Sequence, residues 1–66
     1  MVGVILRNLR GQKTQEQVAT DIGVSKSALA MYERDERTPR DEIKVRLAGY
    51  YGKTVQEIFF SHNEHI

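Results

Sequence analysis

Residues 15–39, QEQVATDIGVSKSALAMYERDERTP, decide the fold of this chain because they predict two short helices joined by a tight turn. Val18 and Ile22 recur one helical turn apart and belong to one apolar stripe. Gly23 then interrupts the pattern, and a glycine adopts positive φ without a Cβ clash, so it suits the bend between two helices. Ser25 is a good N-cap for the second helix.

The second of these helices has two unlike faces. Leu29 and Tyr32 point back toward the first helix and are expected in the core. The opposite face carries short or flexible side chains with a cation at each end, namely Lys26, Ser27, Ala30, Met31 and Arg34. Such a surface fits the major groove of DNA, which admits one α-helix and offers base-edge acceptors and thymine methyl groups.

These residues resemble the Cro/repressor-type (XRE-like) helix-turn-helix family of bacterial and phage transcriptional regulators. The matching positions are Gln15, Ala19, Gly23, Ser25 and Glu33, with the apolar set Val18, Val24, Leu29 and Tyr32. The resemblance extends from about Ile5 to Phe59 and implies an all-α, five-helix, lambda-repressor-like domain. It also implies a transcriptional repressor that binds palindromic double-stranded DNA as a homodimer, with the second helix of the motif as its recognition helix.

The flanking sequence predicts three more helices. Residues 2–10 carry an apolar stripe at helical spacing and form the first helix. Thr38 as N-cap and Pro39 at the first helical position open the fourth helix, and Gly52 ends it. A capping box that begins at Thr54 opens the fifth helix.

Length and composition limit the number of domains, the kinds of binding site and the location that the sequence allows. Sixty-six residues allow one small domain, expected over residues 1–61 before a short tail of residues 62–66, and a domain of this size is marginally stable unless it oligomerises. The absence of cysteine excludes disulfides and thiolate metal sites. No apolar run is long enough to span a membrane and no signal peptide is evident, so a cytoplasmic location is expected. The net charge of +1 is weak for a nucleic-acid binder, so the DNA hypothesis depends on where the charges lie.

Base contacts are expected from the exposed face of the recognition helix. Lys26 and Ser27 begin this helix, from which the family reads sequence, and lysine can donate to guanine O6 and N7. Met31 lies one turn on and would pack on a thymine methyl group. The alternatives are a solvated cation for Lys26 and core filling for Met31.

Phosphate contacts are expected from five residues around this helix: Gln15, Ser25, Arg34, Arg37 and Arg40. The resemblance implies two roles for Gln15, a bond to a phosphate and a brace for the start of the recognition helix. Phosphate contacts fix register and make affinity salt-dependent, but they carry no sequence information. For Arg37 and Arg40 the alternative is a solvated surface.

The resemblance also interprets two positions outside the DNA surface. Arg10 best fits the family position that pairs with the glutamate after the recognition helix, here Glu33, and the alternative is a solvated surface charge. A partly buried pair would hold the first helix on the motif. The family usually has glycine where Asp35 stands, because the backbone is left-handed there, and aspartate tolerates that region better than most residues.

A homodimer interface is expected from aromatic and apolar residues near the end of the chain, namely Phe60, Tyr50 and Ile66. Exposed apolar patches commonly mark contact surfaces. The alternative is that Phe60 completes the core of the monomer.

Other functions have less support in the sequence. His62, His65 and Glu64 would make only a partial metal site, so neither an enzyme nor a metal or cofactor is expected. The stronger alternative is an antitoxin or a protein-interaction subunit that uses the same fold to bind a protein partner. Such a module would bind its partner without Lys26 and would not bind duplex DNA.

Overall fold

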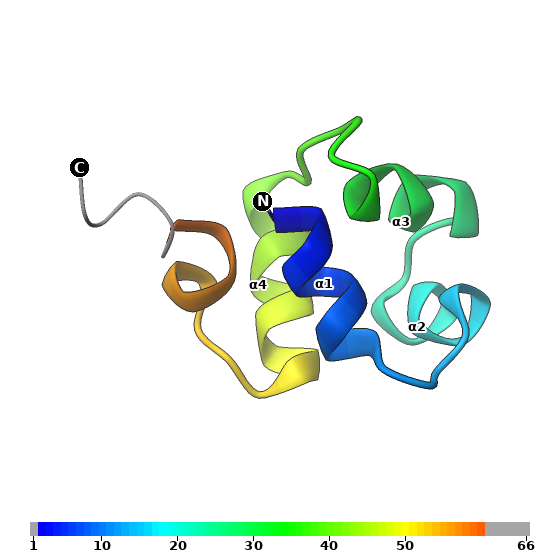
Figure 1. Ribbon diagram of the computed structural model, residues 1–66, viewed down its shortest axis with the longest axis horizontal. Coiled ribbons are helices and arrows are strands. Elements are labelled where there is room, and N and C mark those ends of the chain that lie inside the picture. Colours follow the sequence, from blue (N-terminus) through cyan, green and yellow to red (C-terminus); the bar gives the residue numbers. More distant parts are fainter. Residues whose placement is uncertain (1, 61–66) are drawn as a thin grey trace.

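The computed structural model describes residues 2–60, which form five helices and no strand (Figure 1). The helices are α1 (Val2–Arg10), α2 (Gln15–Ile22), α3 (Lys26–Glu33), α4 (Asp41–Tyr51) and the short π-helix η1 (Gln56–Phe60). The predicted all-α, five-helix architecture is confirmed.

One apolar core joins all five helices. Figure 1 shows α1 crossing α4, with α2 and α3 on one side of this pair and η1 on the other. The buried apolar side chains are Leu6, Val18, Ala19, Ile22, Leu29, Tyr32, Leu47, Ala48, Ile58 and Phe59. The helix α3 contributes Leu29 and Tyr32 to this core, and its last residue, Glu33, is also buried, so the exposed surface of α3 lies on its other side.

The helix-turn-helix of α2 and α3 has the predicted local structure. The Thr14 hydroxyl accepts a hydrogen bond from the Gln17 amide at 3.0 Å and caps α2. Gly23 ends α2 with φ +81°. The Ser25 hydroxyl accepts a hydrogen bond from the Ala28 amide at 3.0 Å and caps α3. These contacts fix the direction in which α3 leaves the turn.

The predicted start of the fourth helix is wrong. The helix α4 begins at Asp41 after Arg40, and the Arg40 side chain makes no capping hydrogen bond among residues 2–60. Pro39 is buried instead, in a small pocket that it shares with side chains from α1, α3 and η1, including Val2, Tyr32 and Phe59. The backbone is still extended at Arg40, with φ −64° and ψ 160°, so the helix starts two residues later than the local signal indicates.

The capping box at Thr54 forms, but it opens a π-helix. The Thr54 amide donates to the Glu57 carboxylate at 2.8 Å, and the Glu57 amide donates to the Thr54 hydroxyl at 3.0 Å. Ile58 and Phe59 of η1 are buried, whereas Phe60 is 44% exposed. Phe60 therefore does not complete the monomer core.

The first helix packs unusually closely on the end of α3. A Cβ atom at Gly3 would lie 2.2 Å from the Glu33 carbonyl oxygen, so only glycine fits. The Gly3 amide donates to the Asp35 carboxylate at 3.0 Å, and the Arg7 guanidinium donates to the Glu33 carbonyl. Asp35 has φ +60°, the left-handed conformation expected at this position. The end of α3 is thereby attached to the start of α1.

Candidate nucleic-acid interface

One face of α3 is open to solvent and forms a shallow groove with the start of α2. The residues that line this groove, called the α3 groove below, are Gln15, Lys26, Ser27, Ala30, Met31 and Arg34. Lys26, Ser27 and Arg34 are exposed, and Met31 is half-buried. The structure therefore brings the three residues with expected base contacts onto one surface, away from the core.

Two more arginines lie on the other flank of α3. A second groove, between α3 and the start of α4, is lined by Val24, Ala28, Tyr32, Arg37, Arg40, Glu42 and Ile43. Ala28 and Arg34 lie on opposite flanks of α3 at helical spacing. Arg34 therefore lies on one side of the exposed face of α3, and Arg37 and Arg40 lie on the other. Contacts to the phosphates of both DNA strands would require this arrangement.

The positive charge of Arg34 is partly compensated within the protein. Its guanidinium lies 3.0 Å from the Glu36 carboxylate, and both side chains are more than half exposed. This hydrogen bond raises the pKa of Arg34 and lowers the pKa of Glu36. Exposed pairs of this kind contribute little stability, so a phosphate could replace Glu36 at Arg34 at small cost.

A buried carboxylate lies directly behind the α3 groove. Glu33 is 1% exposed, and Arg10 reaches it through two hydrogen bonds, from Nε to Oε2 at 2.9 Å and from Nη2 to Oε1 at 3.2 Å. The sequence pairs these two residues, and the structure contains the pair. The Gln15 amide also donates to Glu33 Oε1, at 2.9 Å.

This contact corrects one expectation for Gln15. Its side chain braces the last residue of the recognition helix rather than the start of that helix. A buried carboxylate accepts stronger hydrogen bonds than neutral groups do, which explains why the amide turns toward Glu33. Sequence reasoning identified Gln15 and Glu33 separately and missed their contact, because residues 18 positions apart carry no common local signal.

Ser25 is placed at the solvent-exposed start of α3. Its hydroxyl oxygen already accepts the capping hydrogen bond from Ala28. The hydroxyl proton remains available as a donor, which is the group that a phosphate contact would use.

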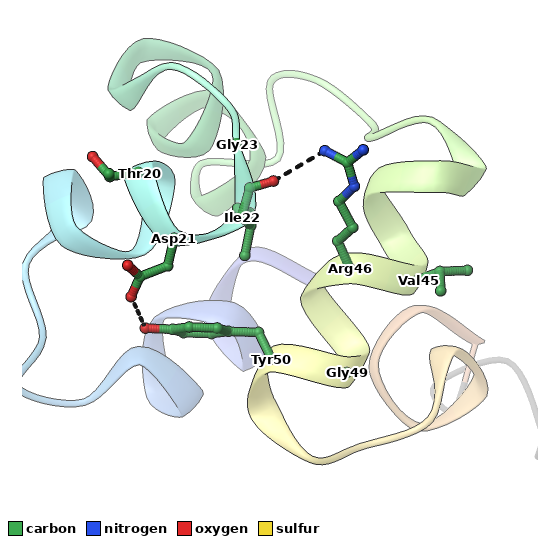
Figure 2. A pocket seen from close by; sticks show the side chains of 8 residues that line it. All are labelled: Thr20, Asp21, Ile22, Gly23, Val45, Arg46, Gly49 and Tyr50. Carbon is green, nitrogen blue, oxygen red and sulfur yellow. Dashed lines mark hydrogen bonds between the residues drawn. The ribbon is translucent and has the colours of Figure 1, made fainter.

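A third groove separates α2 from α4 and shows how the motif is attached to the rest of the domain (Figure 2). The Tyr50 hydroxyl donates to the Asp21 carboxylate at 2.6 Å, and Arg46 Nη1 donates to the Ile22 carbonyl at 3.2 Å. The bond to Asp21 raises the pKa of Tyr50. Asp21 and Arg46 were not identified from the sequence, since neither carries a motif of its own.

Tyr50 and Phe60, two of the three residues expected at a dimer interface, do not form one patch within the protomer. Tyr50 points toward α2 (Figure 2), whereas Phe60 belongs to η1 on the other side of α4 (Figure 1). The Lys44 ammonium lies 5.2 Å from the centre of the Phe60 ring. Ile66 lies outside the described residues.

Residues 2–60 contain neither a candidate metal-binding cluster nor a candidate membrane-spanning helix. No group of three or more histidine, cysteine, aspartate or glutamate side chains is arranged to hold a metal ion there. No helix in this part of the chain is long and apolar enough to cross a membrane. The partial metal site considered above, His62, Glu64 and His65, lies outside the described residues.

Comparison with known proteins identifies related sequences. Residues 6–58 match the family model described as Helix-turn-helix. A curated relative from Vibrio cholerae, the cryptic phage CTXphi transcriptional repressor RstR, is 36% identical over 55 residues. The match covers 80% of this chain and 50% of the relative, so the chain spans about half the length of the relative. No solved structure matches.

Proposed function

The chain belongs to the XRE-type helix-turn-helix family, and we propose that it is a DNA-binding transcriptional regulator that represses transcription as a homodimer on a palindromic operator. One observation carries this proposal: the buried face of α3 fills the core, and the α3 groove on the opposite face is open, is lined by no acidic side chain among residues 2–60, and is flanked by arginines. A major groove accepts a helix presented in this way.

Sequence is read from the α3 groove in this proposal. Lys26 donates to guanine O6 and N7, and Ser27 bonds an adjacent base edge. Met31 packs on a thymine methyl group one helical turn further along. The half-buried Met31 side chain lines the α3 groove, which supports this role over core filling.

The DNA backbone is held on both flanks of α3. Gln15 and Arg34 contact the backbone of one DNA strand, and Arg37 and Arg40 contact that of the other. Ser25 contacts a phosphate from the exposed start of α3. The arginine contacts release counterions, so affinity falls steeply with salt.

Two copies are needed because one short helix makes few base contacts. Each wrong base pair costs roughly 1–3 kcal/mol, so useful discrimination requires a second half-site. A two-fold dimer would place the two recognition helices about 34 Å apart, in successive major grooves. The interface is proposed at Phe60, whose ring is 44% exposed, together with Ile66. Tyr50 is bonded to Asp21 within the protomer and contributes less than its sequence position indicates.

Repression follows from occupying promoter DNA, which excludes the polymerase. The relative that covers most of this chain carries the name transcriptional repressor, which supports this direction of control. A protein-interaction module remains the outcome to be distinguished by experiment.

Selection of bound duplexes from a random pool tests the proposal. The expected result is enrichment of a two-fold symmetric motif, with guanine at the position contacted by Lys26. The double variant Lys26→Ala, Ser27→Ala should keep its circular dichroism spectrum and lose about 10-fold or more in affinity for that motif. Recovery of no duplex at low salt would contradict DNA binding and favour a protein partner.

A further inference from the structure

The side chain of Gln15 connects the buried interior to the open α3 groove. At its inner side, Nε2 donates to Oε1 of Glu33, which is 1% exposed. At its outer side, Gln15 lines the groove next to Lys26 and Ser27. One residue therefore both bonds the buried carboxylate and lines the surface proposed to face DNA.

The chemistry of the two groups fixes the orientation of this amide. An ionised carboxylate only accepts hydrogen bonds, so the amide nitrogen, and not the amide oxygen, must face Glu33. A primary amide nitrogen carries two protons, and the bond to Glu33 uses one of them. The second N–H diverges from the first within the amide plane, and within residues 2–60 the structure shows no other acceptor bonded to it.

Arg10 makes this arrangement compatible with an incoming anion. A lone carboxylate behind the groove would repel a phosphate, but two guanidinium N–H groups of Arg10 neutralise Glu33. The Arg10 side chain is itself held by a hydrogen bond to the Lys13 carbonyl at 2.8 Å. Arg10, Glu33 and Gln15 thus form a chain in which each hydrogen bond polarises the next.

We propose that Glu33 is a positioning residue for DNA-backbone binding: its buried carboxylate, neutralised by Arg10, holds the Gln15 amide so that the second N–H is presented to a phosphate. This inference rests on the proposed DNA-binding function. Without Glu33, the Gln15 side chain would have to lose its rotational freedom when DNA binds, and the amide could also present its oxygen to the phosphate.

A double-mutant cycle on duplex binding tests the inference. The probe is a duplex recovered from the random pool, and the variants are Gln15→Leu, Glu33→Gln and the double variant, each checked for folding by circular dichroism. Gln15→Leu should lower affinity about 10-fold per half-site, since a hydrogen bond to a charged group is lost. Glu33→Gln should lower affinity by a similar factor, because it frees the amide to turn. The double variant should bind no more weakly than Gln15→Leu alone.

Salt dependence separates this contact from an ionic one. Gln15 is neutral, so Gln15→Leu should lower affinity at every salt concentration and leave the slope of log affinity against log salt unchanged. Arg37→Ala is the matched comparison, with a slope reduced by about 1. A slope change for Gln15→Leu would contradict the proposed neutral contact.

The other contrary results are equally definite. If the losses of Gln15→Leu and Glu33→Gln multiply in the double variant, Glu33 acts through general stability and the positioning role is wrong. If Gln15→Leu has no effect while the parent binds the duplex, Gln15 makes no phosphate contact. Failure of the parent to bind any duplex would contradict the proposed function itself.

A spectroscopic measurement covers the case in which Glu33→Gln does not fold. In the parent protein, the two side-chain N–H protons of Gln15 should give separate NMR signals, one of them shifted by the bond to Glu33. Adding duplex should move the second signal and leave the first nearly unchanged. Movement of the first signal instead would show that DNA displaces Gln15 from Glu33, which would overturn the inference.

Discussion

Two contacts attach the helix-turn-helix to the rest of the domain, and they differ in packing. At the α1–α3 junction, defined by Gly3, Arg10, Glu33 and Asp35, backbone meets backbone, and a carboxylate is fully buried. At the α2–α4 groove, two long side chains, Tyr50 and Arg46, bridge an open space (Figure 2). The junction leaves no room for a side chain between α1 and the end of α3, whereas the groove is spanned only by side chains. The end of the recognition helix is therefore held directly against α1.

The largest effect on stability is expected from removing the buried Glu33 carboxylate from the α1–α3 junction. Glu33→Ala leaves the Arg10 guanidinium without its counterion and the Gln15 amide without an acceptor, so it should reduce the free energy of unfolding by about 3 kcal/mol. The lower end of the usual range applies because the Arg10 side chain remains 20% exposed. Urea denaturation measures this loss. Arg10→Met, Glu33→Leu is the matched control and should recover most of the stability, since neither charge remains unpaired.

The next largest effect on stability is expected when a glycine at the junction is replaced, and a second helical glycine provides the comparison. Gly3→Ala places a Cβ atom against the Glu33 carbonyl and should cost about 1–3 kcal/mol, because α1 must move away from α3. Gly49→Ala on α4 meets open space and should instead stabilise by about 0.5–1 kcal/mol, the usual gain for alanine over glycine in a helix. Thermal unfolding of both variants measures the contrast. Equal effects from the two changes would show that the junction is not tightly packed.

These glycines also show which parts of the fold the sequence predicts. The caps and the turn of the helix-turn-helix act within three or four residues, so Thr14, Gly23 and Ser25 were identified from local patterns alone. Nothing local requires glycine at position 3, because the atom that excludes a side chain belongs to residue 33. The start of α4 was misplaced for the same reason, since burial of Pro39 depends on three distant helices.

The candidate site divides in the same way. Helical periodicity alone places Lys26, Ser27 and Met31 on one exposed face, and the structure has them there. Periodicity gives no information about the partner of a long polar side chain, so the bond from Gln15 to Glu33 required coordinates. The separation of Tyr50 from Phe60 likewise depends on which neighbours α4 has on each side.

The smallest effects on stability are expected at two adjacent tyrosines. Tyr50 lies in the α2–α4 groove, and Tyr51 lies near Glu33 of the α1–α3 junction. Tyr50 bonds Asp21 in the groove, so Tyr50→Phe should lower stability slightly. The Tyr51 hydroxyl is buried near Glu33 and has no hydrogen-bond partner among residues 2–60, so Tyr51→Phe should raise stability at neutral pH by about 1 kcal/mol. The two rings pack edge to face with their centroids 5.2 Å apart. Both variants keep this ring packing and remove only a hydroxyl group, so each is a control for the other. Urea denaturation at pH 7 gives both values.

Alkaline pH sharpens the Tyr51 prediction, because burial raises the pKa of Tyr51 to about 12 in the folded protein. The unfolded chain ionises this group near pH 10, so between pH 10 and 12 the unfolded state holds fewer protons and Tyr51 makes the folded state progressively less stable. Below pH 10 this contribution is constant. The advantage of Tyr51→Phe over the parent should therefore grow as pH rises from 9 to 11, which urea denaturation at both values measures. An advantage that stays constant would mean that the hydroxyl is solvated in the folded protein, and the junction would then be more open than its packing indicates.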